Sequence, residues 1–494
     1  MCGVVGVFSL EGQNADIPQK LEALLRHSRN RWQKWYGVAV LSEWKLIRHV
    51  SAELSWVSEA LKKYKWKTEL IIGHARYPTS WGDEWGDAKL QPFEVKSESL
   101  SETGHSFAFN GNIVNADIIA EGLKKEWFVF EHTPILDTEV LKFMILKKVR
   151  EGVTDLKEIL EYIHNKIDGC CNIILINKEW DMAVAKDKWG FRPLEYGVKD
   201  GLLFVASEST ALMKIGCEKV DHISGWEILL INKGDAAHRI ERMKIEEPVT
   251  KQRCFFEAVY FADPRTLLWW EAASAYRYRF WQVLAEQDLG RFDPENTIIV
   301  DIPASSEDAA KWYADKIGIE RVQAIIKKPQ SKRTFIDDPA TRKDKVKEKY
   351  VFNPELKPFL KWKKVVLMDD SIVRWTTLEH LVQAFKKFYE PSEIHVRIPS
   401  PPVIAPCFYG MNMAEVETLK ATKYFKDIKN PTEAELRTLW KSFWATSLRY
   451  LTPPSLVSAL KMHVNHICLA CVTAQYPTPC GQATYDKQIE AMKV

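Results

Sequence analysis

The chain has 494 residues, a net charge of +3 and 46% hydrophobic residues, and its length predicts two or more domains rather than one core. Basic residues are spread along the chain, so the composition does not favour a protein that binds nucleic acid. No apolar run approaches the roughly 18–20 residues that span a bilayer, and the N-terminus lacks the basic segment and cleavage site of a secretory signal. We therefore expect a globular protein without a membrane or nucleic-acid partner.

Cysteine usage indicates a reducing compartment. Nine cysteines in a chain of this length do not form a disulfide scaffold, so we expect a cytoplasmic protein with free thiols. Individual cysteines are then available for catalysis or for metal binding. The 19 tryptophans are a high count, for which aromatic packing is the only physical account that the sequence offers.

The first ten residues, MCGVVGVFSL, place Cys2 directly before an apolar, strand-like run. One interpretation is a buried edge strand in which the cysteine is a small hydrophobe. The other is an N-terminal nucleophile, because removal of Met1 would leave Cys2 with both an attacking thiol and an α-amine that accepts its proton. An α-amine titrates near about 8, so it can act as a base close to neutral pH.

The first half alternates short apolar strands with helical patterns, which predicts a layered α/β domain. We expect strands at 3–8, 37–41, 70–75, 106–110, 171–177, 182–186 and 202–206, and helices near 17–28, 116–125, 137–150 and 154–165.

Polar clusters follow several of these strands. In GHARYPT at 73–79, Arg76 could hold a carboxylate, although a surface arginine beside a turn is the simpler interpretation. In FNGNIVN at 109–115, Asn110 and Gly111 form a turn signal and also offer the two donors that an oxyanion hole needs. Asp137 is a plausible helix cap that could instead pair with an ammonium group. Two further clusters lie at 186–194 and 206–209.

In this order behind an N-terminal Cys-Gly, the clusters resemble the class II glutamine amidotransferase family over roughly residues 2–240. The resemblance implies the N-terminal nucleophile hydrolase fold, an αββα sandwich. It also implies that Cys2 attacks the side-chain amide of glutamine, that Asn110 and the Gly111 N–H stabilise the oxyanion, and that Arg76 and Asp137 bind the α-carboxylate and the α-amine. The chain departs from the family pattern at Trp81, Phe109, Lys186 and Trp189, and with SGWE at 224–227 in place of Pro-Gly-Glu.

The second half follows a polar, strand-poor junction at 241–252, so we expect a second domain over 253–494. Strands at 297–302, 322–326, 365–368 and 393–398 alternate with helices at 306–316 and 377–387. This alternation predicts a parallel, doubly wound sheet.

The most informative segment of this half is VVLMDDSIVRWTTL at 365–378. A buried strand runs into Asp369 and Asp370, then into a Ser/Thr-rich turn and a helix. Backbone N–H groups at such a helix start bind phosphate, and the carboxylates can hold ribose hydroxyls or Mg²⁺. An acidic loop with a helix cap is the alternative.

The segment resembles the phosphoribosyl pyrophosphate motif of type I phosphoribosyltransferases. With KRTFI at 332–336, SPP at 400–402 and PCFYG at 406–410, the chain resembles the family of glutamine phosphoribosylpyrophosphate amidotransferases. This implies that glutamine-derived ammonia displaces pyrophosphate from phosphoribosyl pyrophosphate to give 5-phosphoribosylamine, the first step of de novo purine synthesis. Family members are usually homotetramers inhibited by purine nucleotides, and we expect the same assembly and inhibition for this chain.

The resemblance also implies a substrate site. Its residues are Ser305, Arg333, Arg342, Lys349, Asp369, Asp370, Ser371, Arg374, Thr376 and Thr377, with Mg²⁺ held by Asp369 and Asp370. Trp375 stands where the family has glycine and where the backbone must approach the 5′-phosphate closely.

Cys468 and Cys471, spaced CLAC, could belong to a zinc site, a redox pair or neither. Together with Cys254 and Cys407 they match family members that carry a [4Fe–4S] cluster, for which ligation by four thiolates is suitable. Zinc in a four-cysteine site is the alternative.

Two other functions stay open on the sequence. One is a divergent paralogue that hydrolyses glutamine but transfers poorly because of Trp375, and acts as a regulatory or binding subunit. The other is a different glutamine-dependent synthase with the same first half, against which Asp369 and Asp370 argue.

Overall fold

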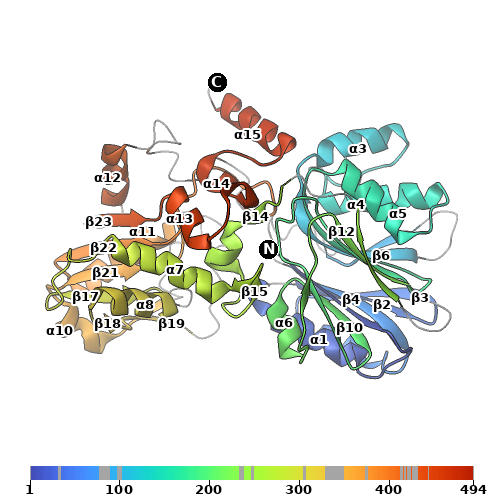
Figure 1. Ribbon diagram of the computed structural model, residues 1–494, viewed down its shortest axis with the longest axis horizontal. Coiled ribbons are helices and arrows are strands. Elements are labelled where there is room, and N and C mark those ends of the chain that lie inside the picture. Colours follow the sequence, from blue (N-terminus) through green and yellow to red (C-terminus); the bar gives the residue numbers. More distant parts are fainter. Residues whose placement is uncertain are drawn as a thin grey trace.

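A computed structural model provides the coordinates of the chain and shows two halves side by side (Figure 1). It describes residues 2–31, 35–76, 90–96, 103–232, 239–245, 250–303, 307–328, 350–372, 376–411, 416, 419, 424, 432–442 and 444–492.

The first half is built on two antiparallel sheets. The seven-stranded sheet has the order β11 (Asp221–His222), β9 (Glu195–Lys199), β10 (Leu202–Ala206), β1 (Gly3–Ser9), β4 (Thr68–Arg76), β2 (Trp35–Ser42) and β3 (Lys45–Ser51). The six-stranded sheet has the order β13 (Arg239–Lys244), β12 (Glu227–Asn232), β8 (Met182–Lys186), β7 (Gly169–Asn177), β6 (Thr103–Ile113) and β5 (Phe93–Lys96).

Helices cover the outer face of each sheet. The seven-stranded sheet carries α1 (Ile17–His27), α2 (Leu54–Lys62) and α6 (Ser209–Lys214), and the six-stranded sheet carries α3 (Ala116–Lys125), α4 (Asp137–Arg150) and α5 (Leu156–Lys166). The alternation of β1 explains the layering, because Val5 packs with α1 while Val4 packs against the other sheet. The predicted αββα sandwich is therefore confirmed (Figure 1).

The second half contains a five-stranded sheet in which every neighbouring pair is parallel. Its order is β18 (Arg321–Val322), β17 (Thr297–Asp301), β21 (Lys364–Met368), β22 (Glu393–Ile398) and β23 (Ser447–Tyr450). One face packs on α7 (Ala273–Glu286), α8 (Glu307–Ile317) and α13 (Pro453–Leu460), and the other on α11 (Thr376–Tyr389). Helices on both faces of a parallel sheet confirm the predicted doubly wound fold.

Shorter elements complete this half. Three two-stranded sheets pair β14 (Arg253–Cys254) with β24 (Ile467–Cys468), β15 (Leu267–Leu268) with β16 (Glu271–Ala272), and β19 (Ile325–Lys327) with β20 (Tyr350–Phe352). The remaining helices include the π-helix η3 (Glu257–Phe261), α10 (Lys357–Leu360), α12 (Glu433–Lys441), α14 (Ala470–Thr473) and α15 (Pro479–Ala491).

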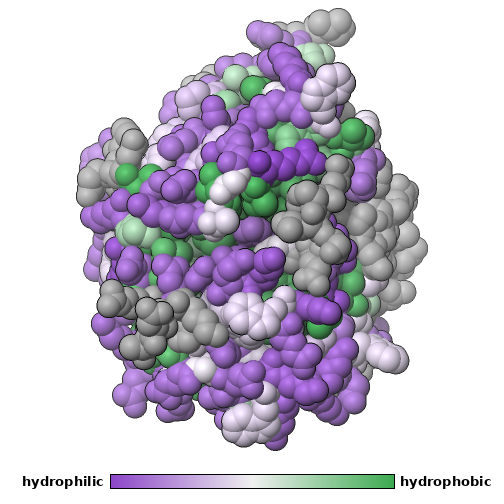
Figure 2. All heavy atoms as spheres, turned by 90° about the vertical axis from the view of Figure 1, so that its right-hand side faces the viewer, coloured by the Kyte–Doolittle hydropathy of each residue, from purple (hydrophilic) through white to green (hydrophobic). Residues whose placement is uncertain are grey.

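The described residues include no helix that is long and apolar enough to cross a membrane. Figure 2 views the side of the first half, where hydrophilic residues cover most of the visible surface and hydrophobic residues form small patches between them.

Candidate active sites

Cys2 lies at the start of the central strand of the seven-stranded sheet. Gly3 pairs with Ala75 of β4, and this antiparallel register, continued by one residue, places Cys2 opposite Arg76. The Val4 N–H donates to Ser207 Oγ at 3.0 Å, which fixes the strand just after the cysteine. All seven residues of β1 are buried, whereas Cys2 is only partly buried. The cysteine is therefore anchored by a rigid strand while its own position stays accessible.

The predicted oxyanion donors lie on β6 of the facing sheet. Asn110 is 3% exposed, and its buried Nδ2 finds no hydrogen-bond partner among the described residues. A Cβ added to Gly111 would stand 1.9 Å from the carbonyl oxygen of Cys170 on β7, so only glycine fits there. A buried amide donor without a partner is costly unless a ligand supplies the acceptor. The geometry thus suits an oxyanion that is present only during reaction.

Asp137 is held next to this strand by the first turn of α4. The Ile113 N–H donates to Asp137 Oδ2 at 3.0 Å. Desolvation raises the pKa of the Asp137 carboxyl to about 7, because few groups nearby compensate its charge. An ammonium group docked on Asp137 would supply that compensation.

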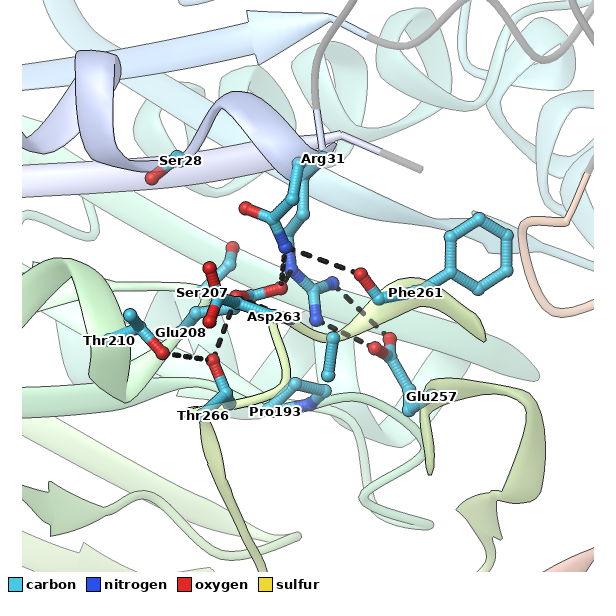
Figure 3. A network of polar contacts seen from close by, with 12 residues as sticks. Ser28, Arg31, Pro193, Ser207, Glu208, Thr210, Glu257, Phe261, Asp263 and Thr266 are labelled. Atoms are coloured by element: carbon cyan, nitrogen blue, oxygen red, sulfur yellow. Dashed lines mark hydrogen bonds and ion pairs between the residues drawn. The ribbon is translucent and has the colours of Figure 1, made fainter. Parts of the chain in front are cut away.

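A buried ion-pair network joins the first half to the second (Figure 3). The Arg31 guanidinium contacts Glu208 Oε1 at 2.5 Å and Glu257 Oε2 at 2.6 Å, and all three side chains are at most 2% exposed. Thr266 Oγ1 donates to Glu208 at 2.8 Å, and Asn30 Nδ2 donates to Glu208 at 2.6 Å. A Cβ added to Gly3 would lie 3.8 Å from Arg31 Cβ, so the network lies close to the residue that follows Cys2. Sequence reasoning missed it, because the partners of Arg31 lie 177 and 226 residues away.

The loop around Tyr409 brings the second half into contact with β6, the strand that carries Asn110 and Gly111, which we call the oxyanion strand. Asn112 Nδ2 donates to the Phe408 carbonyl at 3.0 Å, and Phe191 stacks on Tyr409 with ring centroids 4.2 Å apart. Gly410 has a φ of +91°, and a Cβ there would approach the Gly111 carbonyl to 3.2 Å. Asn112 lies inside the predicted cluster at 109–115, although no role was predicted for it.

The acidic residues of the second half lie at the carboxyl end of β21. The Asp370 N–H donates to Asp369 Oδ1 at 3.0 Å, and Ser371 Oγ donates to Asp370 Oδ1 at 2.7 Å. Burial, followed by the charges of both aspartates, raises the pKa of Tyr350, which sequence reasoning had not singled out. The neighbouring strand β17 ends at the same edge, where ligands of parallel α/β sheets bind.

Several of the predicted substrate contacts lie in segments outside the described residues. Ser305, Arg333, Arg342, Lys349, Arg374 and Trp375 lie outside the described residues, and of Thr376 and Thr377 only the backbone is described, at the start of α11.

The four cysteines of the predicted metal centre gather between β14, β24 and the loop at Cys407. Cys254 pairs with Cys468 in a parallel register, and the Tyr409 N–H donates to Cys407 Sγ at 3.4 Å. Burial raises the pKa of Cys254 to about 12 and that of Cys471 well above its usual value, and the charge of Cys407 adds to both. Within the described part of the chain, however, no group of three or more His, Cys, Asp and Glu side chains is arranged to hold a metal ion.

Comparison with known proteins gives matches over nearly the whole chain. Residues 87–214 match the family described as a glutamine amidotransferase domain. The amidophosphoribosyltransferase of Methanocaldococcus jannaschii is 30% identical, with 97% of this chain and 98% of that protein covered. The amidophosphoribosyltransferase of Bacillus subtilis is 30% identical, with 98% of this chain and 95% of that protein covered.

A solved structure agrees with these relatives. The structure of glutamine phosphoribosylpyrophosphate amidotransferase from B. subtilis, complexed with ADP and GMP, superposes with a TM-score of 0.80 at 28% identity, covering 99% of this chain and all of that one. The similarity thus spans both sheets and both candidate sites.

Proposed function

The chain belongs to the amidophosphoribosyltransferase family, and on this premise we propose how its residues divide the reaction. The protein is a pentosyltransferase with glutamine amidotransferase activity, and its relatives are the first enzymes of purine biosynthesis. The relatives give no support to the alternative of a glutaminase without transfer. The observation that carries the proposal is that Asn110 Nδ2, beside Gly111, has no hydrogen-bond partner among the described residues. It lies on a strand that the second half contacts at Phe408.

The first half releases ammonia from glutamine. The Cys2 thiol gives its proton to its own α-amine and attacks the amide carbon. Asn110 Nδ2 and the Gly111 N–H stabilise the tetrahedral oxyanion. The C–N bond breaks, the leaving nitrogen takes the proton and departs as ammonia, and water hydrolyses the γ-glutamyl thioester to glutamate. Arg76 and Asp137 bind the α-carboxylate and the α-ammonium of glutamine.

The second half transfers that ammonia to phosphoribosyl pyrophosphate. Ammonia forms a bond to ribose C1 while the bond to pyrophosphate breaks, and the proton lost by nitrogen goes to solvent or base. Asp369 and Asp370 hold the ribose hydroxyls, and the start of α11 with Ser371, Arg374, Thr376 and Thr377 binds the 5′-phosphate. Ser305, Arg333, Arg342 and Lys349 bind the pyrophosphate.

Mg²⁺ is the metal that this acidic edge suits, with Asp369 and Asp370 as the residues that would hold it through oxygen atoms. When bound, it would neutralise charge on the departing pyrophosphate.

The four cysteines Cys254, Cys407, Cys468 and Cys471 offer thiolate ligands, which are the ligands that a [4Fe–4S] cluster requires. Four cysteines from three segments lie near enough to interact electrostatically, and the Tyr409 N–H donates to the Cys407 sulfur. Such N–H···S bonds tune bound clusters. Cys254, Cys407, Cys468 and Cys471 would hold the group, whose role would be structural or oxygen-sensing; zinc is the second candidate.

We add proposals for the domains, regulation, assembly and location of the chain. We place the glutaminase domain at 2–240 and the phosphoribosyltransferase domain at 253–494. The B. subtilis structure holds ADP and GMP, which supports purine nucleotides as ligands that regulate this chain. We further assign it a homotetrameric, cytoplasmic form.

The test of the two-site reaction is pyrophosphate release from phosphoribosyl pyrophosphate and Mg²⁺, with either glutamine or ammonia as the nitrogen donor. We expect release with both donors. Cys2→Ser should abolish release with glutamine and preserve release with ammonia. Glutamate formation without pyrophosphate from either donor would instead identify the chain as a glutaminase that does not transfer.

A further inference from the structure

Tryptophan occupies an unusual backbone conformation at eight positions. Among the described residues, thirteen that are not glycine have a positive φ, and eight of these are tryptophan. They are Trp44, Trp66, Trp127, Trp180, Trp226, Trp269, Trp362 and Trp444, with φ between +60° and +71°. The left-handed region favours glycine, and after it asparagine and aspartate, whereas a bulky side chain there is a genuine outlier.

One hairpin has an exact counterpart in the same molecule. Ser42 pairs with Lys45 across a two-residue loop in which Glu43 has φ +51° and Trp44 has φ +64°. In the β9–β10 hairpin the same loop is Asp200 and Gly201, with φ +50° and +68°. Two positive φ values define a type I′ turn, whose second position is ordinarily glycine. Trp44 therefore stands at a glycine position.

A helix end gives the same comparison. After α4, the N–H of Gly152 donates to the Val149 carbonyl and the N–H of Val153 to that of Lys148. After α3, Trp127 and Phe128 donate to the carbonyls three and five residues earlier in the same way. This is the Schellman motif, which places glycine at the left-handed position. Trp127 takes the place that Gly152 takes after α4.

Packing of the indole rings does not offset the backbone strain at most of these positions. Trp127 is 91% exposed, and Trp362, Trp66, Trp44 and Trp444 are between 58% and 72% exposed. An exposed side chain contributes little burial energy. The backbone at these sites thus has a conformation that favours glycine, and the exposed indole ring does not stabilise it.

The other tryptophans form a separate population. Seven further described tryptophans have an ordinary negative φ, namely Trp35, Trp56, Trp189, Trp270, Trp281, Trp312 and Trp440. Among them, Trp281 lies in α7, where it is buried and fits a helical backbone. Eight independent replacements of glycine by the same residue type would be needed to explain the first population, whereas a single cause explains all eight.

We propose that glycine occupies these eight positions in the protein that its own cell makes, because one codon, written as tryptophan in the sequence, is decoded there as glycine. Tryptophans with a negative φ are encoded by the ordinary tryptophan codon and remain tryptophan. The proposal accounts for eight of the 19 tryptophans of the chain, a high count for which packing gave no specific account.

The proposal extends to Trp375, and this extension alone rests on the proposed function. Trp375 stands at the glycine position of the phosphate-binding segment at 365–378. The resemblance implies glycine at this position, because it implies that the backbone of the segment approaches the 5′-phosphate closely. With glycine at position 375, the reason to expect poor transfer to phosphoribosyl pyrophosphate no longer applies.

Peptide mass spectrometry of the protein isolated from its natural source tests the assignment directly. We expect peptides that contain glycine at the eight positions and tryptophan at Trp56, Trp281 and Trp312. Tryptophan at the eight positions would overturn the proposal. The gene should show one codon at the eight positions and a different one at the other three.

A recombinant comparison tests the backbone argument. Trp127→Gly and Trp66→Gly should raise the melting temperature, while Trp56→Gly should lower it, because Trp56 is similarly exposed but lies inside α2. A lower melting temperature in all three variants would overturn the proposal. If the chain with tryptophan at the eight positions does not fold, folding of the chain with glycine at all eight supports the proposal. If instead the tryptophan chain folds and the eight-glycine chain does not, the proposal is overturned.

Trp375→Gly is then added to the eight-glycine chain and pyrophosphate release is measured. A gain extends the proposal to the phosphate loop. An unchanged rate counts against the assigned phosphate site and leaves the mass result for the other eight positions standing.

Discussion

At the scale of single residues, Asn110 carries the sharpest expectation. Asn110→Ala removes the one buried amide donor without a partner in the described structure around the oxyanion strand. Loss of one oxyanion donor lowers the catalytic rate about 10²–10³-fold. We therefore expect that loss in glutamine hydrolysis, measured as glutamate formation, with ammonia-dependent pyrophosphate release unchanged.

Asn115→Ala is the matched control, because Asn115 lies near the same strand but donates to the Lys166 carbonyl at an exposed site. It should leave glutamine hydrolysis close to that of the unaltered protein. An Asn110→Ala protein that hydrolyses glutamine at the normal rate would remove Asn110 from the mechanism.

Asp137 gives a pH dependence. Its carboxyl has a pKa of about 7, raised by desolvation, and only its ionised form attracts the α-ammonium of glutamine. As pH falls through about 7, the carboxylate gains a proton, so the KM for glutamine should rise while ammonia-dependent release changes little. Asp137→Asn should show a high KM that no longer varies over this range. A KM profile that is the same in both proteins would contradict the assignment.

At the scale of elements, η3 and η1 (Arg29–Arg31) are held together by charge. Glu257→Gln leaves Arg31 buried with Glu208 as its remaining ionic partner. Breaking a buried pair costs about 3–5 kcal/mol, so calorimetry should show a clear drop in melting temperature. Glu59→Gln, in the exposed pair with Lys62, should leave the melting temperature unchanged. Equal effects of the two substitutions would show that the buried network does not hold these elements together.

At the scale of the whole molecule, Gly410 joins the two activities. Gly410→Ala places a methyl group 3.1 Å from Arg192 Nη2 and 3.2 Å from the Gly111 carbonyl oxygen, so the loop of the second half and strand β6 must separate by a few tenths of an ångström. We expect the ratio of glutamate formed to pyrophosphate released to rise above one, because ammonia then escapes between the halves.

Gly290→Ala is the control, since Gly290 also has a positive φ but an added Cβ meets nothing within 4 Å. It carries the backbone strain without the contact, and should leave the ratio at one. A ratio that rises equally in both variants would show that strain, rather than this contact, uncouples the activities.

The sequence predicted the fold and much of the chemistry because both depend on local patterns. The β1 run and the strand before Asp369 are short apolar segments that end in reactive groups, and such patterns are visible without neighbours. The partners of Arg31 and the contact of Asn112 with Phe408 could not be predicted, because they join segments far apart in the chain. The raised pKa of Asp137 depends on the same tertiary burial.

The central place of β1 in its sheet has a consequence for how the chain folds during synthesis. Its two neighbours are β4 and β10, and Val5 pairs with Ala206. Contacts between such distant parts of a chain form slowly, since the intervening loop must first be closed. On the ribosome, the strand made first must therefore wait for one of the last strands of its sheet. A nascent chain that ends before β10 leaves one edge of β1 unpaired, and we expect chaperones to bind such an edge.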